Sequence, residues 1–319
     1  MSNNLIPVLV LVGPTASGKT DLSIKIAKNF DAEIVSADSM QIYKEFNILT
    51  AKPSKEELES VKHHFIDEVS VKEEFSVADY VKKAHEVIKD VNNRGKLPMI
   101  VGGTGLYVDS LINNISFNEE KYDENIRKSL WNIYKSGSYQ ELLDELKSID
   151  PESFDNIHPN NVKRVIRAIE FFRITGKPIS QQIRESKLVD SPYFTNIIGI
   201  NYKDRSKLYD KINKRIDKML ENGLIEEVQA LSKINISKTA KEAIGYKEIL
   251  PYLNGECDLL TAVENLKMQT RRYAKRQITW FNRNKNIKWF YIDDYDEKES
   301  MICDIINFIS NLGRPKDGK

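Results

Sequence analysis

The strongest constraint in this 319-residue sequence is an octapeptide at residues 13–20, Gly-Pro-Thr-Ala-Ser-Gly-Lys-Thr. It follows an apolar run from Leu5 to Val12 and precedes a stretch with helical character. A strand, a glycine-rich loop and a helix in this order make a P-loop, whose backbone N–H groups and helix N-terminus hold phosphate oxygens. The octapeptide therefore predicts a strand-loop-helix unit that binds a phosphorylated compound.

Two side chains of this loop have chemistry suited to phosphates. Lys19 supplies a positive charge, and the hydroxyl of Thr20 can bind Mg²⁺. The loop does not identify its ligand, because ATP, GTP and a pyrophosphate ester all offer the same oxygens. Other parts of the chain have to decide between them.

Short β-rich runs alternate with longer amphipathic stretches along the chain. The runs are residues 7–12, 33–36, 98–101, 197–202 and 287–292. This alternation is typical of a parallel sheet with helices on both faces. We predict an α/β fold of the P-loop NTPase type, formed by residues 1–116 and 193–313, with a loose tail at 314–319.

The long interval at residues 117–192 has helical charge patterning and no convincing strand, so it predicts an inserted all-helical domain. Apolar residues at helical spacing mark one face of a helix within it: Val162, Val165, Ile166, Ile169 and Phe172. Basic residues gather on another face: Lys163, Arg164 and Arg167. Residues 207–231 and 259–282, which follow the fourth strand, also predict helices.

Three polar features follow predicted strands, where ligands of open α/β sheets bind. The first is the P-loop, the second is Asp38 with Ser39, and the third is the glycine-rich segment 102–105 with Thr104. Asp38 alone could be a turn or helix-cap residue. Beside a phosphate loop, its carboxylate can also accept a proton or order Mg²⁺-bound water. For His63 and His64 we expect a structural role and not a shared metal, because on a strand two adjacent residues would point to opposite faces and no Cys or third His lies near.

Basic residues are concentrated in one segment, although the net charge of the chain is only +1. Residues 265–288 contain eight lysines or arginines and no acidic residue. Such a segment favours a polyanion. Together with the basic face at Lys163, Arg164 and Arg167, it indicates a nucleic-acid backbone near the phosphate site.

The composition excludes several classes of protein. With 40% hydrophobic residues and 30% charged residues of nearly balanced sign, we do not expect a disordered polyelectrolyte. The longest apolar run, residues 5–12, is too short to span a bilayer. The N-terminus lacks the pattern of a signal peptide, so we expect a cytoplasmic protein without a membrane partner, and we expect a monomer. Cys257 and Cys303 are 46 residues apart without metal-site spacing, and we assign them no role.

Several motifs, in order from about residue 6 to about residue 290, resemble the tRNA dimethylallyltransferase family. They are GPTASGKT (13–20), DSMQIY (38–43), TAKP (50–53), HHFID (63–67), VGGTGLY (101–107), HPNNVKRVIRAIE (158–170), IGY (244–246) and TRRYAKRQITWF (270–281). The P-loop alone would indicate only a superfamily. The ordered set implies transfer of a dimethylallyl group from its diphosphate to the exocyclic amine of the adenosine 3′-adjacent to the tRNA anticodon.

The resemblance also implies roles for individual residues. The diphosphate would bind to the loop residues Gly13, Pro14, Thr15, Ala16, Ser17, Gly18, Lys19 and Thr20. Lys19 and Arg215 would neutralise the leaving group, Thr20 would help to hold Mg²⁺, and Asp38 would be the general base. The adenine pocket would be formed by Asp38, Ser39, Met40, Gln41 and Thr104. The anticodon stem-loop would be held by Arg127, Lys163, Arg164, Val165, Ile166, Arg167, Arg271, Arg272, Lys275 and Arg276.

Two alternatives share part of this pattern. An ATP-dependent kinase of a small metabolite has the same strand, loop and Mg²⁺, but it leaves the basic segment 265–288 unexplained. A non-catalytic RNA-binding protein with a vestigial P-loop would not need Asp38. Incubation with labelled dimethylallyl diphosphate and unmodified tRNA distinguishes the three.

Overall fold

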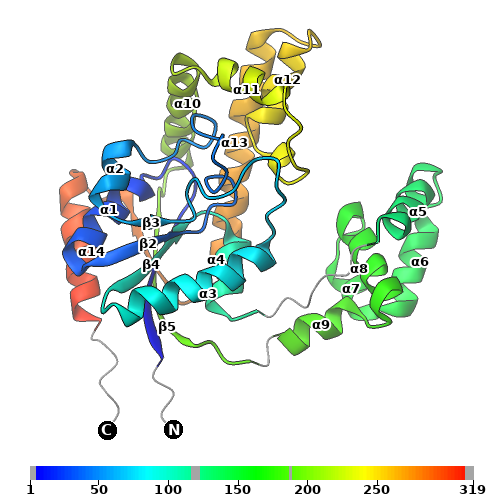
Figure 1. Ribbon diagram of the computed structural model, residues 1–319, viewed down its shortest axis with the longest axis horizontal. Helices are drawn as coiled ribbons and strands as arrows, with labels where there is room; N and C mark the ends of the chain where they lie inside the picture. The colour runs from blue at the N-terminus through cyan, green and yellow to red at the C-terminus, as the bar shows by residue number, and fades with distance from the viewer. Residues whose placement is uncertain (1–4, 116–122, 187–188, 313–319) are drawn as a thin grey trace. The chain divides into compact units, whose positions relative to one another are not determined.

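The structure, a computed structural model, describes residues 5–115, 123–186 and 189–312. The described residues form two compact units, one within residues 1–112 and 192–319 and the other within residues 113–191. The first unit is built on a parallel sheet and the second contains only helices among its described residues (Figure 1). The α/β fold class with a helical insertion is confirmed. The predicted tail at 314–319 lies outside the described residues.

The sheet has six strands in the order β3-β2-β4-β1-β5-β6, and all of its pairings are parallel. The strands are β1 (Ile6–Val12), β2 (Ala32–Ser36), β3 (His63–His64), β4 (Leu97–Gly102), β5 (Tyr193–Asn201) and β6 (Ile287–Tyr291). Five of them match the predicted runs, although β5 begins four residues before the predicted start at 197. The two-residue edge strand β3 was not predicted, because two residues are too few for a period to be recognised.

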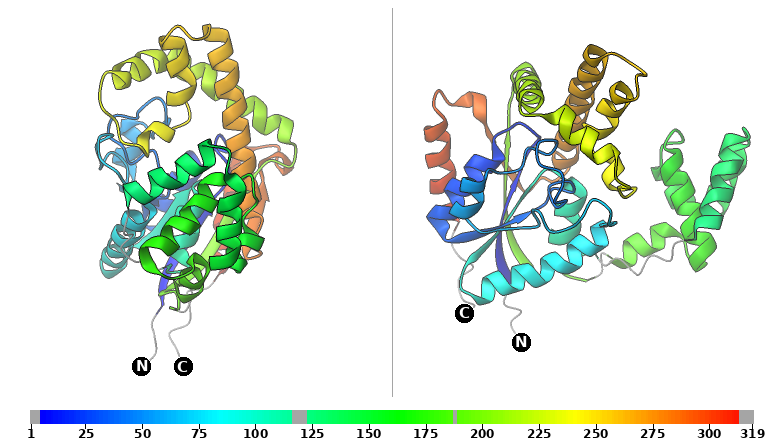
Figure 2. Two further views of the ribbon diagram at one scale, coloured as in Figure 1. Left: turned by 90° about the vertical axis from the view of Figure 1, so that its right-hand side faces the viewer. Right: turned by 45° about the horizontal axis from the view of Figure 1, so that its top comes forward.

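Helices cover both faces of this sheet (Figures 1 and 2). They are α1 (Lys19–Phe30), α2 (Lys55–Ser60), α3 (Val77–Asn93), α4 (Gly105–Ile112) and α14 (Lys298–Asn311). Leu9 and Leu11 of β1 belong to the core under α1 and α14, while Val8 and Val10, equally buried, alternate with them. A strand buried on both faces explains the continuous apolar run that precedes the P-loop.

The first unit also contains a group of helices that follows β5. These are α10 (Arg205–Glu221), α11 (Leu224–Ser232), η1 (Ala240–Glu242), α12 (Tyr246–Leu253) and α13 (Leu259–Phe281), and the short η2 (Ile292–Asp294) follows β6. The helical character predicted over 207–231 is confirmed, and it is divided between α10 and α11. Gly223 adopts a φ of 96° between α10 and α11, a left-handed conformation that ends one helix before the next begins.

The helical unit consists of α5 (Glu124–Lys135), α6 (Tyr139–Ile149), α7 (Pro151–Asn156), α8 (Val162–Thr175) and α9 (Ile179–Ser186). Val165, Ile166 and Ile169 of α8 are buried against Leu130 of α5 and Leu142 of α6. The unit therefore has a hydrophobic core of its own. The predicted apolar face of α8 is confirmed at these three positions.

Candidate functional site

The P-loop lies between the end of β1 and the start of α1. Gly18 occupies the N-cap position with a φ of 80°, which favours glycine and lets the chain turn directly into the helix. The Ser17 hydroxyl donates to the Pro14 carbonyl (2.8 Å), and Lys19 Nζ donates to the carbonyls of Gly13 (2.9 Å) and Pro14 (2.7 Å). The lysine ammonium therefore lies over the loop, where phosphate oxygens would bind.

Asp38 follows β2 at the same edge of the sheet. Its Oδ1 accepts hydrogen bonds from the backbone N–H groups of Met40 (2.9 Å) and Gln41 (3.3 Å), which fix the orientation of the carboxylate. The N–H of Ser39 donates to Thr104 Oγ1 (3.2 Å) in the loop after β4. The predicted meeting of these two loops is confirmed by this bond.

Arg215 reaches the site from α10. Its Nη2 donates to the carbonyl of Thr50 (3.1 Å), in the loop that follows Asp38. Glu227 of α11 holds the same loop, since its carboxylate accepts from the N–H groups of Ile48 and Leu49 (2.9 Å each). The helices after β5 thus fix both Arg215 and the loop that carries the candidate base.

Burial lowers the pKa of both candidate cations. It lowers the pKa of Lys19 to about 7, with a further lowering from the nearby Arg215 guanidinium, while the Asp38 carboxylate acts in the opposite direction. The pKa of Arg215 is also lowered by burial, and Asp38 again opposes the shift. Two cations brought together in a partly dry site create an environment that favours a bound polyanion.

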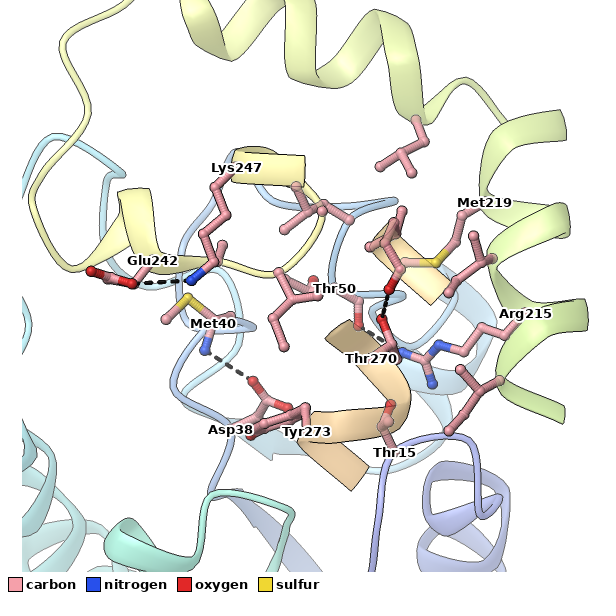
Figure 3. A pocket seen from close by; sticks show the side chains of 18 of the residues that line it. Thr15, Asp38, Met40, Thr50, Arg215, Met219, Glu242, Lys247, Thr270 and Tyr273 are labelled. Atoms are coloured by element: carbon pink, nitrogen blue, oxygen red, sulfur yellow. Dashed lines mark hydrogen bonds and ion pairs between the residues drawn. The ribbon is translucent and has the colours of Figure 1, made fainter. Parts of the chain in front are cut away.

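Two cavities meet at these residues. The first, of about 330 Å³, has an apolar wall formed by Leu49, Ile212, Ile216, Met219, Leu224, Ile244 and Leu266. The second, of about 120 Å³, is lined by P-loop residues, with Gln41, His63 and Gly103. Thr15, Asp38, Arg215 and Tyr273 line both cavities. Figure 3 shows Asp38 and Arg215 approaching the first cavity from a loop and from α10.

Two residues of this site were not identified from the sequence. Tyr273 lines both cavities, and Gln277, one helical turn later on α13, lines the P-loop cavity and is buried. Both belong to the segment 270–281, in which only the basic residues were predicted to bind tRNA. Their spacing of four, which places them on one helix face, was the available signal.

The predicted RNA-binding residues of the helical unit lie in different environments. Lys163 and Arg164 are exposed at the start of α8. Val165 and Ile166 are buried in the core of the unit, so their side chains support the helix. Arg127 Nη2 and Arg167 Nη1 both donate to Oε2 of the fully buried Glu170, at 2.7 and 3.2 Å.

The basic residues of α13 also differ from one another. Arg272 and Lys275 are exposed, whereas Arg271 Nη1 donates to Asn213 Oδ1 of α10 (2.8 Å). Arg276 lies over the Tyr273 ring, 5.6 Å from its centroid, and lines the first cavity. One end of this basic face therefore reaches the same cavity as Asp38.

The P-loop cavity offers side-chain oxygens for metal binding, among them those of the predicted Mg²⁺ ligand Thr20 and of Asp38. Thr20 and Asp38 line the P-loop cavity, and Mg²⁺ is commonly held by one or two protein oxygens together with phosphate oxygens. The residues present thus suit Mg²⁺ bound with a diphosphate. Within the described part of the chain, no three His, Cys, Asp or Glu side chains form a group that could hold a metal without a ligand.

His63 and His64 have structural partners. His63 Nδ1 donates to the carbonyl of Val61 (2.8 Å), and His64 Nε2 lies 2.9 Å from a carboxylate oxygen of Glu33. His63 also lines the P-loop cavity.

Across the three described segments, no helix combines the length and the apolar composition needed to cross a bilayer.

Comparison with known proteins gives a consistent result. Residues 41–284 match a profile described as IPP transferase. The chain is 50% identical over 308 residues to a tRNA dimethylallyltransferase of Acetivibrio thermocellus, and 48% identical over 308 residues to one of Thermoanaerobacter sp. (strain X514). Each alignment covers 96% of this chain and 98% of the relative.

Solved structures agree with these sequence relatives. The crystal structure of a tRNA isopentenylpyrophosphate transferase from Bacillus halodurans is 42% identical, with a TM-score of 0.72 and 96% of both chains covered. A eukaryotic dimethylallyltransferase, captured while acting on tRNA, is 29% identical with a TM-score of 0.78, covering 98% of this chain and 81% of that one. By its sequence and by its fold, the chain belongs to the IPP transferase family.

Proposed function

We propose that the protein transfers a dimethylallyl group from dimethylallyl diphosphate to the exocyclic amine of the adenosine 3′-adjacent to the anticodon of tRNA. The observation that carries the proposal is the junction of two cavities at Asp38, Arg215 and Tyr273. One cavity offers a phosphate cradle, and the other offers an apolar wall beside a carboxylate. A prenyl diphosphate donor and the adenine that accepts the prenyl group need these two environments side by side.

The donor's diphosphate binds in the P-loop cavity in this proposal. The loop N–H groups and the N-terminus of α1 hold its oxygens, while Lys19 and Arg215 stabilise the charge that develops as it leaves. Thr20 would hold Mg²⁺, which when bound offsets negative charge on the diphosphate. Each preorganised contact to the leaving group contributes about 3 kcal/mol to lowering the barrier.

The transfer step exchanges one bond for another. The adenosine nitrogen forms a bond to C1 of the dimethylallyl group, and the bond between C1 and the diphosphate oxygen breaks. The proton of the amine passes to the carboxylate of Asp38, and the diphosphate leaves with the electron pair. The bonds from Met40 and Gln41 hold the carboxylate in one orientation for this transfer.

The acceptor base has to leave its stack before it can reach the cavity. Enzymes that modify bases generally flip them out, and an RNA loop makes this least costly. Ser39, Met40, Gln41 and Thr104 are proposed to surround the adenine. Exposed cations of α13 and α8, such as Arg272, would contact phosphates of the anticodon stem-loop.

A transfer assay with matched RNAs tests the proposal. The protein is incubated with Mg²⁺, labelled dimethylallyl diphosphate and an unmodified anticodon stem-loop, and the control RNA carries inosine, which lacks the exocyclic amine, at the target position. We expect label in the adenosine RNA and none in the inosine RNA. Equal labelling of both RNAs, or labelling of neither, contradicts the proposal.

The kinase alternative gives the opposite result in a parallel assay. A kinase would hydrolyse or transfer the γ-phosphate of ATP and would leave the RNA unlabelled. The family relationship does not favour a kinase.

We also propose that the protein is a monomer and that it works in the cytoplasm. The mass of the purified protein, measured by light scattering, tests whether it is a monomer.

A further inference from the structure

Gln277 connects two loops of the site that are far apart in sequence. Its side chain lies at the buried face of α13 and is 5% exposed. Oε1 accepts the backbone N–H of Thr15 in the P-loop (2.9 Å), and Nε2 donates to the carbonyl of Gly103 in the loop after β4 (2.9 Å). Both polar atoms of the amide are therefore used, and each contacts a different loop of the active site.

The same contacts extend toward Asp38. The hydroxyl of Tyr273 interacts with the side chains of Gln277 and Thr104, and burial raises the pKa of this hydroxyl to about 12, so it stays protonated at neutral pH. Thr104 Oγ1 accepts the N–H of Ser39, the residue after Asp38. A continuous series of polar contacts thus runs from the P-loop through α13 to the loop of the candidate base.

We infer that Gln277 is a positioning residue, which fixes the conformation of the phosphate loop and the position of that loop relative to Asp38. A P-loop binds phosphate with backbone N–H groups, so its affinity depends on the direction of each peptide unit. The side chain of Gln277 accepts the N–H of the peptide unit between Pro14 and Thr15, and Gln277 is itself held in place by α13. Without this bond, the loop would have to be ordered by the ligand itself, and the affinity for the ligand would fall.

A competing explanation is that Gln277 serves only to pack α13 against the sheet. In that case its loss would lower the stability of the protein and affect every ligand alike. A positioning role affects the phosphate ligand selectively. The inference depends on the proposed function only through the kind of ligand, so inorganic pyrophosphate, which needs no transfer reaction, is the appropriate probe.

The experiment compares two variants of the full-length protein at the same helix. Gln277→Met keeps the length of the side chain and removes both hydrogen bonds. Gln269→Met is the matched control, because Gln269 lies two turns earlier on α13 and its amide contacts Asn265 of the same helix. Pyrophosphate affinity is measured by calorimetry with Mg²⁺, and stem-loop RNA affinity by fluorescence anisotropy without pyrophosphate.

We expect Gln277→Met to weaken pyrophosphate binding about tenfold, the effect of two neutral hydrogen bonds, with RNA affinity changed less than about twofold. In the transfer assay, the KM for dimethylallyl diphosphate should rise by a similar factor. Equal losses for pyrophosphate and RNA, or a pyrophosphate affinity equal to that of Gln269→Met, would overturn the inference.

Gln277→Glu provides a second variant if the methionine variant does not fold. A glutamate keeps an acceptor for the Thr15 N–H but places an oxygen against the Gly103 carbonyl, so pyrophosphate affinity should again fall. In the wild type, the amide hydrogen of Thr15 should exchange slowly with solvent before any ligand is added. Rapid exchange of that amide in the free protein would contradict the proposed bond.

Discussion

At the scale of single residues, the charge of Lys19 determines how the phosphate loop responds to pH. Its pKa is lowered to about 7 in the free protein, so the ammonium loses its proton as the pH rises through 7. A bound diphosphate favours the charged form and has to recover that proton above pH 7. The affinity for pyrophosphate should therefore fall about thirtyfold between pH 6 and pH 8.5, as measured by calorimetry.

Lys19→Arg is the control for this prediction. An arginine side chain stays charged throughout the range, so this variant reports only the titration of pyrophosphate itself. The difference between the two pH profiles isolates the lysine. Parallel profiles for wild type and variant would show that Lys19 is fully charged at neutral pH.

The carboxylate of Asp38 allows a second prediction at this scale. Asp38→Asn keeps an oxygen that can accept the N–H groups of Met40 and Gln41, but it removes the proton acceptor. Single-turnover transfer at saturating RNA and dimethylallyl diphosphate should slow by about 10²–10⁴, with both affinities nearly unchanged. If the rate recovers at saturation, Asp38 acts in binding and not in proton transfer.

At the scale of helices, the start of α8 contributes exposed charge to the helical unit. Replacing Lys163 and Arg164 together by glutamine should lower the slope of log affinity for tRNA against log salt concentration by about 1–2 units, because fewer counterions are released. The matched control replaces Lys128 and Lys135 of α5 by glutamine. These two lysines are exposed and lie outside the predicted RNA-binding set. An equal change of slope in both variants would mean that the effect is one of net charge.

The contact between α4 and α13 depends on a glycine. A Cβ on Gly105 would lie 2.3 Å from Cδ1 of Trp280, whose Nε1 donates to Asp109 Oδ2 of α4 (2.6 Å). Gly105→Ala should therefore destabilise the protein by about 1–3 kcal/mol in chemical denaturation, because the indole ring has to move. Leu106→Ala is the control, since Leu106 is the next residue of α4 and its side chain is exposed. A loss for Gly105→Ala no larger than that for Leu106→Ala would contradict this packing.

At the scale of the whole molecule, the buried carboxylate of Glu33 makes the unfolding free energy of the α/β unit depend on pH. Hydrogen bonds from Arg94 hold the pKa of Glu33 near 2, with His64 assisting and burial opposing the shift. The pKa is lowered relative to the unfolded chain, so the stabilisation is present above about pH 4.5 and is lost as the pH falls toward 2. The difference in unfolding free energy between wild type and Glu33→Gln should shrink over this range. A constant difference between pH 5 and pH 3 would contradict the assignment.

The sequence predicted those parts of the fold that depend on local pattern. Apolar runs located five strands, and the P-loop octapeptide located the phosphate cradle. The rule that ligands bind at the carboxyl ends of parallel strands brought Asp38 and Thr104 together, as the bond between Ser39 and Thr104 confirms. The division of residues 207–231 into two helices was not predicted, although Gly223 is the kind of residue that often ends a helix.

Contacts between distant residues could not be predicted in this way. Arg127 and Glu170 are 43 residues apart, and nothing in either local pattern indicates that this buried carboxylate holds both Arg127 and Arg167. Thr15 and Gln277 are 262 residues apart. Such pairs are set by how whole elements pack, so they become visible only when the elements are placed in three dimensions.

The position of β1 in the sheet has a consequence for the order in which the protein matures during synthesis. β1 pairs with β4 on one side and with β5 on the other, and the whole helical unit is translated between these two partners. The nascent α/β portion therefore keeps an open edge at its most apolar strand until residue 201 has left the ribosome. The helical unit, with its own core, can fold during this wait. Gln277 is made later still, so we expect the nascent chain to gain its full affinity for the donor only after residue 277 has emerged from the ribosome.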